Sequence, residues 1–176
     1  NNSKEKLELV HRLDKDTSGC LMISKKRVSL VFLQELLRRP GSISKRYTAL
    51  VHGDWPEKLT YINQALETYS NEGRERWTKV SASGKSARTG FRKISGNEDF
   101  SLVEAFPKTG RTHQIRVHAL WARHPIVGDI RYGDKFKEAV LGLKTRMMLH
   151  ASQISIPQNK HVGKVDVECP LSQEFA

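Results

Sequence analysis

Strand-like segments that follow one another without a helix between each pair are the feature that most constrains how this chain can fold. Apolar and polar residues alternate along these segments, as they do in strands that bury one face. The expected strands are residues 7–13, 20–24, 45–53, 77–82, 87–94, 101–106, 147–156 and 164–168. Successive strands joined by turns favour antiparallel pairing. We therefore expect an α+β fold with a mixed, mostly antiparallel sheet and flanking helices, rather than a doubly wound parallel sheet.

Helices are expected in three places beside this sheet. Residues 29–39 carry leucines at helical spacing and stop at Pro40 and Gly41. Residues 112–123 form the second expected helix, with Thr112 as its N-cap and Pro125 beyond its end. A short helix is expected within residues 133–146. The chain of 176 residues, without an internal repeat or a low-complexity linker, suits a single domain with one hydrophobic core.

The balance of charge indicates a polyanionic partner. The chain has 30 Lys and Arg residues against 19 Asp and Glu, a formal net charge of +11, and nucleic acid is the commonest partner of so basic a protein. A basic surface that is merely solvated would give the same composition. Cys20 and Cys169 form neither a CxxC pair nor a disulfide framework, which favours a reducing cytoplasm. No apolar run is long enough to cross a membrane, so we expect a cytoplasmic, monomeric protein.

Motifs for cofactors and for several common hydrolases are absent from the sequence. The chain has no GxxxxGK[ST] or GxGxxG loop that would cradle a nucleotide, no HExxH zinc motif and no GxSxG nucleophile turn. His113 and His118 are five residues apart with no acidic residue between them. We therefore expect no nucleotide cofactor and no metal, and a chemistry that uses side chains alone.

A short acidic loop is the first candidate site. The segment HRLDKDTSG places Asp14 at the end of a strand, between Arg12 and Lys15 and ahead of Gly19. Chains often present a functional carboxylate on a loop of this kind. Asp and Ser-Gly also supply ordinary turn chemistry, so this segment alone leaves both interpretations open.

Two basic segments are the other candidates. In TGRTHQIRVH, Gly110 and Arg111 precede a helix whose first N–H groups are unpaired, which suits a phosphate or a carboxylate. A capped helix with solvated basic residues is the alternative. In KRYTALVHG, Tyr47 on a basic strand could stack on a base, or it could lie in the core with its hydroxyl bonded.

Taken together and in this order, HRLD with TSG, KxYxALVxG and TGRTHQIRVH give a pattern that resembles the RluA-type family of RNA pseudouridine synthases. The segments GDIRYG at 128–133 and LHA at 149–151 are also similar to that family. The resemblance extends over nearly the whole chain, and the branch that it most resembles modifies large-subunit ribosomal RNA. It implies a pseudouridine synthase catalytic domain over residues 1–176. Family members usually have an earlier strand with a Lys-Pro pair, and many have an N-terminal S4-like RNA-binding domain; we expect both to be missing from this chain.

The resemblance also implies a role for individual residues. Asp14 is the expected catalytic aspartate, Arg116 is its ionic partner, and Tyr47 is the ring that stacks on the target uracil and acts as the base in the last proton removal. A nearby guanidinium favours an ionised carboxylate. The expected RNA-binding residues are Arg12, Lys45, Arg111 and His113. The expected partner is RNA, above all large-subunit ribosomal RNA, with no metal or organic cofactor.

Two other functions fit parts of the pattern. A noncatalytic RNA-binding or ribosome-assembly module of the same fold would share the charge and the framework, but it has no need to keep Asp14, Tyr47 and Arg116. A hydrolase with Asp14 and Asp16 as paired carboxylates is the third hypothesis. Two residues apart on a turn, these side chains are expected to point in different directions, with Asp16 helping to cap the turn.

Overall fold

The largest element of the structure is a seven-stranded sheet in the order β11-β10-β4-β9-β8-β5, with β2 beside β10. The computed structural model describes residues 6–39, 41–70, 73, 75–158 and 163–175. The strands of this sheet are β2 (Ser18–Gly19), β4 (Ser44–His52), β5 (Tyr61–Ile62), β8 (Thr89–Gly96), β9 (Phe100–Pro107), β10 (Leu149–Ile156) and β11 (Val165–Glu168). Neighbouring strands are antiparallel except β2 and β10, which are parallel. The mixed, mostly antiparallel sheet predicted from the sequence is confirmed.

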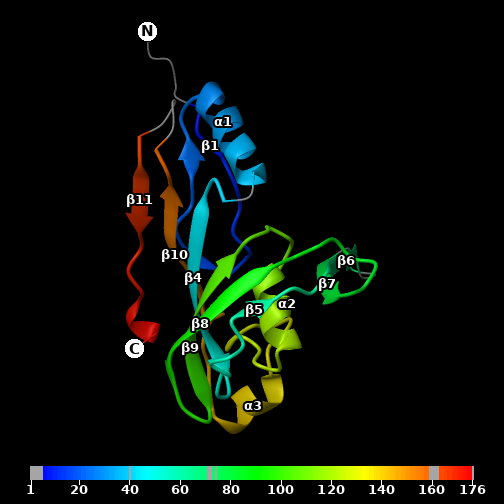
Figure 1. Ribbon diagram of the computed structural model, residues 1–176. Helices are drawn as coiled ribbons and strands as arrows, with labels where there is room; N and C mark the ends of the chain where they lie inside the picture. The colour runs from blue at the N-terminus through cyan, green and yellow to red at the C-terminus, as the bar shows by residue number, and fades with distance from the viewer. Residues whose placement is uncertain (1–5, 40, 71–72, 74, 159–162, 176) are drawn as a thin grey trace.

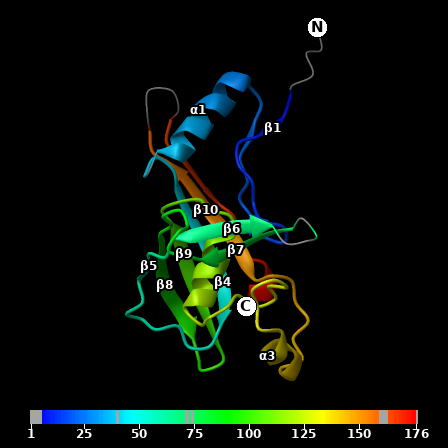
Figure 2. The ribbon, with the colours of Figure 1, turned by 90° about the vertical axis from the view of Figure 1, so that its right-hand side faces the viewer.

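Two small sheets and several helices surround the large sheet. β1 (Glu8–Leu9) pairs with β3 (Ile23–Ser24), and β6 (Leu66–Ser70) pairs with β7 (Arg76–Val80). The helices are α1 (Arg27–Arg38), α2 (Gln114–Trp121), α3 (Lys135–Val140) and the 3-10 turn η1 (Gln173–Phe175). Figure 1 shows α1 with β1 and β3 at one end of the long strands β4 and β10, and α2 and α3 toward the other. In Figure 2 the β6–β7 hairpin lies beside α2, between these ends. Among the described residues, no helix is both long and apolar enough to cross a membrane.

Several boundaries differ from the sequence prediction. The expected strand at residues 7–13 keeps only β1, because the chain then turns. His11 Nε2 accepts a hydrogen bond from Met22 N at 3.1 Å, and Thr17 N donates to Asp14 O at 3.1 Å. β5 and β6 fall outside every predicted strand, and α1 begins at Arg27, two residues before the predicted start.

The helix α2 begins later than predicted, and the prediction of Thr112 as its N-cap is wrong. The N-cap position is His113, whose φ of 52° and ψ of 23° are left-handed and whose side chain makes no capping hydrogen bond. The Gln114 side chain, in the first turn of the helix, instead accepts hydrogen bonds from the loop before α2. Its Oε1 accepts hydrogen bonds from Thr109 Oγ1 at 2.7 Å and from Arg111 N at 3.0 Å. A side chain that reaches back over the loop therefore replaces the expected cap.

The helix α2 covers one face of the large sheet. The main core joins Ile115 and Ala119 of α2 to small residues of β4 and β9: Ala49, Val51, Val103 and Ala105. His118 is fully buried in the same helix; its Nε2 donates to Gln64 O at 3.0 Å, and its Nδ1 lies 2.8 Å from Thr89 Oγ1. Burial lowers the pKa of His118. The neutral ring thus ties α2 to β8 and to the segment before β6.

The short strand β2 fixes the chain that follows Asp14. Gly19 in β2 has a φ of +106°, and a Cβ placed there would lie 2.3 Å from Ala151 O in β10. Cys20 N donates to that same carbonyl at 2.8 Å. Beside it, His150 Nε2 donates to Cys169 O at 3.1 Å, so the Ser18 hydroxyl donates to His150 Nδ1 at 2.8 Å. Only glycine allows β2 to approach β10 so closely.

Replacing Gly19 tests whether this close approach is needed. Gly19→Ala should lower the free energy of unfolding by at least about 2 kcal/mol, because the methyl group meets the β10 backbone in a strained conformation. Urea denaturation would measure the change. Gly163→Ala is the matched control, since a Cβ at Gly163 meets nothing within 4 Å. Equal unfolding midpoints for the two variants would contradict the role given to Gly19.

Candidate active site

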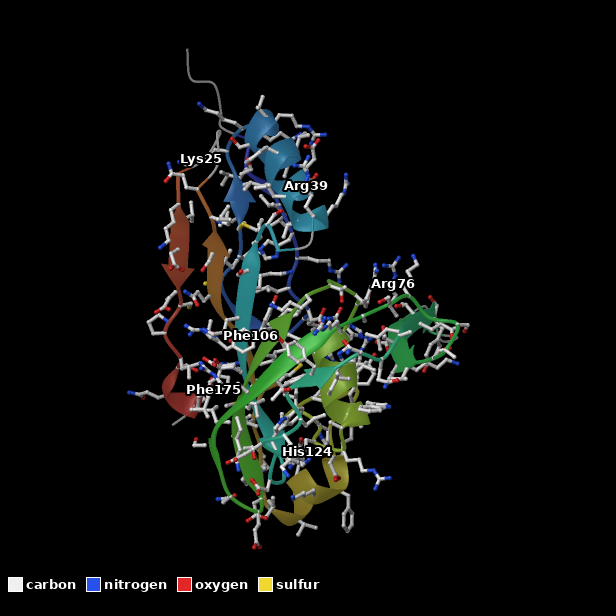
Figure 3. The ribbon with its side chains drawn as sticks, in the orientation of Figure 1. Lys25, Arg39, Arg76, Phe106, His124 and Phe175 are labelled. Atoms are coloured by element: carbon white, nitrogen blue, oxygen red, sulfur yellow. The ribbon has the colours of Figure 1, made fainter. Side chains whose placement is uncertain are left out.

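A pocket of about 700 Å³ is lined by all the site residues expected from the sequence. These residues are Arg12, Asp14, Lys45, Tyr47, Arg111, His113 and Arg116. The lining also includes Arg39, which follows α1, and Arg76 at the start of β7; both are labelled in Figure 3, on the same side of the molecule. Pockets that bind small ligands typically measure about 300–1,000 Å³. The volume therefore suits one extruded nucleotide-sized group.

Asp14 lies on the turn that follows the β1 segment. Its side chain is 22% exposed, and its Oδ2 lies 3.4 Å from Arg116 Nη1. Asp16, in the same turn, has a left-handed backbone with a φ of 70°. The Asp16 side chain is exposed, and Asp16 is not among the described residues that line the pocket. The geometry therefore does not support Asp14 and Asp16 as paired carboxylates.

Arg116 makes its strongest contacts with Asp129, a residue of the GDIRYG segment to which the sequence analysis assigned no role. Its Nε donates to Asp129 Oδ2 at 2.7 Å and its Nη2 donates to Oδ1 at 2.8 Å. The two side chains are 6% and 0% exposed. The backbone N–H groups of Arg131 and Tyr132 also donate to Asp129 Oδ1, at 3.0 and 3.1 Å. Burial alone would raise the pKa of the Asp129 carboxyl, but the hydrogen bonds and charge of Arg116, with those N–H groups, lower it.

This arrangement leaves the Asp14 carboxylate oriented but not neutralised. Asp129 occupies Nε and Nη2 of Arg116, so the longer contact from Nη1 is the one that reaches Asp14. A two-point pair between arginine and carboxylate is stronger and more directional than a single contact. Arg116 is therefore held by Asp129 and points its remaining group at Asp14. The predicted contact between Asp14 and Arg116 is present, but it is the weaker of the two.

Tyr47 and Lys45 reach the pocket from β4. Burial, with the charge of Asp14, raises the pKa of Tyr47 to about 12. The phenol therefore keeps its proton at neutral pH. Burial lowers the pKa of Lys45, and the Lys45 ammonium makes no ion pair with any residue that the structure describes. A cation without a counter-ion that lines a pocket suits an anionic ligand.

The loop before α2 is tied down by Gln114, another residue that the sequence did not single out. Gln114 Nε2 donates to the carbonyl oxygen of Arg88, the residue before β8, at 3.0 Å. Arg111 Nε donates to Ser86 O at 3.1 Å, and the exposed Arg111 side chain lines the pocket. The Arg111 N–H is taken by Gln114. The start of α2 therefore offers fewer free N–H groups to an anion than the sequence predicted, and the side-chain cations matter more.

Among the described residues, no group of three or more His, Cys, Asp or Glu side chains is placed to hold a metal ion. The polar side chains that line the pocket are instead one carboxylate, one phenol, two imidazoles, several cations, and the hydroxyl and amide groups of threonines and Gln114. Such a set can hold an anion, stack on a ring and present a single carboxylate to a reacting atom.

Removal of the Asp129 charge tests how far the site depends on this buried pair. Asp129→Asn should lower the free energy of unfolding by about 3 kcal/mol, because it leaves the Arg116 charge buried with only the weak Asp14 contact. Thermal or urea denaturation would measure it. Glu98→Gln removes an exposed carboxylate and should leave the unfolding midpoint unchanged. If the two variants were equally stable, Asp129 would not be the main partner of Arg116.

This chain is similar in sequence to known proteins over most of its length. The sequence model of the family described as RNA pseudouridylate synthase matches residues 1–121. Ribosomal large subunit pseudouridine synthase C of Buchnera aphidicola subsp. Acyrthosiphon pisum is 41% identical over 172 residues, which are 96% of this chain and 54% of that protein. The protein of the same name from Yersinia pestis is 44% identical over 171 residues, 96% of this chain and 53% of that protein. The chain thus spans about half the length of the curated relatives it matches.

Two solved structures share the fold. Human RNA Pseudouridylate Synthase Domain Containing 1 is 29% identical with a TM-score of 0.74, and the match covers 94% of this chain and 69% of that one. Human RNA Pseudouridylate Synthase Domain Containing 4 is 25% identical with a TM-score of 0.76, covering 96% and 73%. With a family match over residues 1–121 and the same fold, the chain belongs to the RNA pseudouridylate synthase family.

Proposed function

We propose that this chain is the catalytic domain of an enzyme that isomerises uridine to pseudouridine in large-subunit ribosomal RNA. The observation that carries the proposal is the partly exposed Asp14 carboxylate, held beside Arg116 in a pocket that Tyr47 also lines. Cations that have no ion-pair partner among the described residues line the same pocket. Family membership supports the reaction. The relatives named ribosomal large subunit pseudouridine synthase C support the choice of RNA.

The reaction is an isomerisation, so no atom is gained or lost overall. The N1–C1′ bond of the uridine breaks, the uracil turns, and a C5–C1′ bond forms; the proton on C5 leaves and N1 takes one up. We assign the aspartate role to Asp14, which acts on the ribose or on the base in its ionised form. Arg116 directs it, and Asp129 holds Arg116. These steps need no redox partner.

The pocket suits a nucleotide that has left its helix, as enzymes that modify a base require. We assign phosphate and ribose contacts to the cations that line the pocket: Arg12, Lys45 and Arg111. A net charge of +11 favours binding to RNA phosphates. Because ribosomal RNA is modified where ribosomes are made, we further propose that the protein works in the cytoplasm.

Replacing Asp14 separates catalysis from binding. Asp14→Asn keeps the size of the side chain and removes its charge, so it should abolish pseudouridine formation while RNA affinity stays within about threefold, since binding depends on the many basic residues. The measurements are pseudouridine mapping in large-subunit ribosomal RNA from a deletion strain complemented with each variant, and RNA binding by the purified proteins.

Asp16→Asn is the matched control for this experiment. Asn tolerates the left-handed backbone of Asp16, and Asp16 does not line the pocket in the described structure, so this variant should restore the missing pseudouridines. Restoration by Asp14→Asn would contradict the assignment. If even the wild-type gene restored no modified uridine, the chain would instead fit a noncatalytic RNA-binding module of the same fold.

Tyr47→Phe keeps the ring and removes the hydroxyl. Because the pKa of Tyr47 is raised to about 12, a preformed phenolate is not available at neutral pH. The hydroxyl can take the C5 proton only as it passes its own proton on, and uracil N1 is the atom that takes up a proton in the balanced reaction. We expect Tyr47→Phe to bind RNA as the wild type does and to lose turnover by about 100-fold, the size of effect of a lost acid–base group. Single-turnover product formation would show this. Turnover at the wild-type rate would reduce Tyr47 to a stacking role.

A further inference from the structure

His113 has a backbone conformation that calls for an explanation. A left-handed φ of 52° is uncommon in a residue other than glycine, and such conformations gather at functional sites. His113 nevertheless begins α2, since its carbonyl accepts a hydrogen bond from Val117 N at 3.0 Å. Its imidazole does not cap the helix but lines the pocket that contains Asp14. The strained conformation therefore serves to place this ring.

The proton of the imidazole can be located from its neighbours. His113 Nδ1 lies 2.8 Å from the Tyr132 hydroxyl, and that hydroxyl already accepts a hydrogen bond from Thr78 N at 2.8 Å. The Thr78 side chain also hydrogen-bonds to the Tyr132 hydroxyl: burial raises the pKa of Tyr132, whereas the bonds from the Thr78 backbone and side chain lower it, as donors do. With both Thr78 groups donating to it, the Tyr132 hydroxyl gives its own proton to His113 Nδ1. Nδ1 is then unprotonated, so the neutral ring carries its proton on Nε2.

The residue that fixes this tautomer is itself held firmly. Tyr132 is 6% exposed. The guanidinium carbon of Arg116 lies 4.9 Å from the centre of its ring, and the ring of Trp77 packs edge-on with its centre 5.6 Å away. In contrast, His113 Nε2 makes no hydrogen bond to any residue that the structure describes. The pocket thus contains an N–H donor with a fixed direction.

Charged groups around His113 oppose one another. Burial lowers the pKa of His113, and the positive charges of Arg116 and Arg131 lower it further. The negative charges of Asp14 and Asp129 raise it. The balance lies below the usual value of histidine, so the ring is uncharged at pH 7. A neutral donor differs in kind from the lysine and arginines in the same pocket, which suit phosphates.

We infer that the Nε2–H of His113 donates a hydrogen bond to a carbonyl oxygen of the target uracil. This inference rests on the proposed function and adds a catalytic residue to it. Whether Asp14 attacks the ribose, attacks the base or promotes elimination, negative charge develops on the uracil carbonyl oxygens when its bonds to C1′ or within the ring are rearranged. A prepositioned donor aimed at such an oxygen stabilises that charge.

Two substitutions at His113 isolate the donor. His113→Gln keeps an N–H donor and an oxygen that can face Tyr132, whereas His113→Leu removes both in a side chain of similar reach. Both impose the same left-handed strain, so differences between them report the hydrogen bond. With the full-length protein and RNA tritiated at uracil C5, His113→Leu should release tritium about 100-fold more slowly in a single turnover, and His113→Gln within about tenfold of the wild type. RNA affinity should be the same for all three proteins.

A change in the RNA shows which atom receives the hydrogen bond. Oxygen is replaced by sulfur, a weak acceptor, as 2-thiouridine or 4-thiouridine at the modified position. One of these replacements should slow the wild type and leave the residual rate of His113→Leu unchanged, because the lost contact is already absent. Equal slowing of the two proteins, or equal tritium release by His113→Leu and the wild type, would overturn the inference while the proposed function stood. Failure of the wild type to release any tritium would contradict the proposed function itself, and the inference with it.

Discussion

A buried guanidinium must be neutralised before it can direct a second carboxylate, and Asp129 meets this requirement for Arg116. Withdrawing such a charge from water costs several kcal/mol unless a well-placed partner compensates. Asp129 uses both oxygens for the task, and two backbone N–H groups hold one of those oxygens in place. Asp14 then receives a single contact at 3.4 Å. It keeps the reactivity of a weakly paired carboxylate and still has a defined direction.

The strands β4 and β10 provide the rigid frame around this charge arrangement. β4 carries Tyr47 and Lys45 in the interior of the sheet, and β10 beside it holds β2, the continuation of the Asp14 turn. On the other side of β4, β9 leads into the loop that Gln114 ties to the start of α2. A site carried by strands and a helix is positioned more accurately than one carried by loops. The Asp14 turn is the exception, and Gly19 anchors it by the close pairing of β2 with β10.

The parts of this protein that can be predicted from its sequence are those with a regular alternation of residues or a recognisable motif. The alternation of residues gives most strands and the mixed sheet, and the ordered motifs bring Asp14 and Tyr47 to one pocket. Asp129 lies in the GDIRYG segment that supports the family resemblance, but the sequence gives it no role, because nothing in its neighbours distinguishes a buried ion-pair partner from a turn residue. β5 is too short for alternation to appear. The prediction of Thr112 as N-cap failed for a similar reason. The Gln114 side chain reaches back to Thr109 and Arg111 and bonds the loop before the helix. N-cap preferences describe only a short side chain at the first position, so they do not predict this contact.

Because β2 pairs with β10, the Asp14 turn takes up its place only when most of the chain has been made. The side chains of Ser18 and His150, which bond to each other, are 132 residues apart, and at about 5–20 residues per second a ribosome needs on the order of ten seconds to synthesise that interval. Contacts between such distant segments also form late in folding. Arg116 and Asp129 are only 13 residues apart and can meet earlier. In a chain under synthesis, the pair of Arg116 and Asp129 can therefore form before the Asp14 turn takes its place beside it.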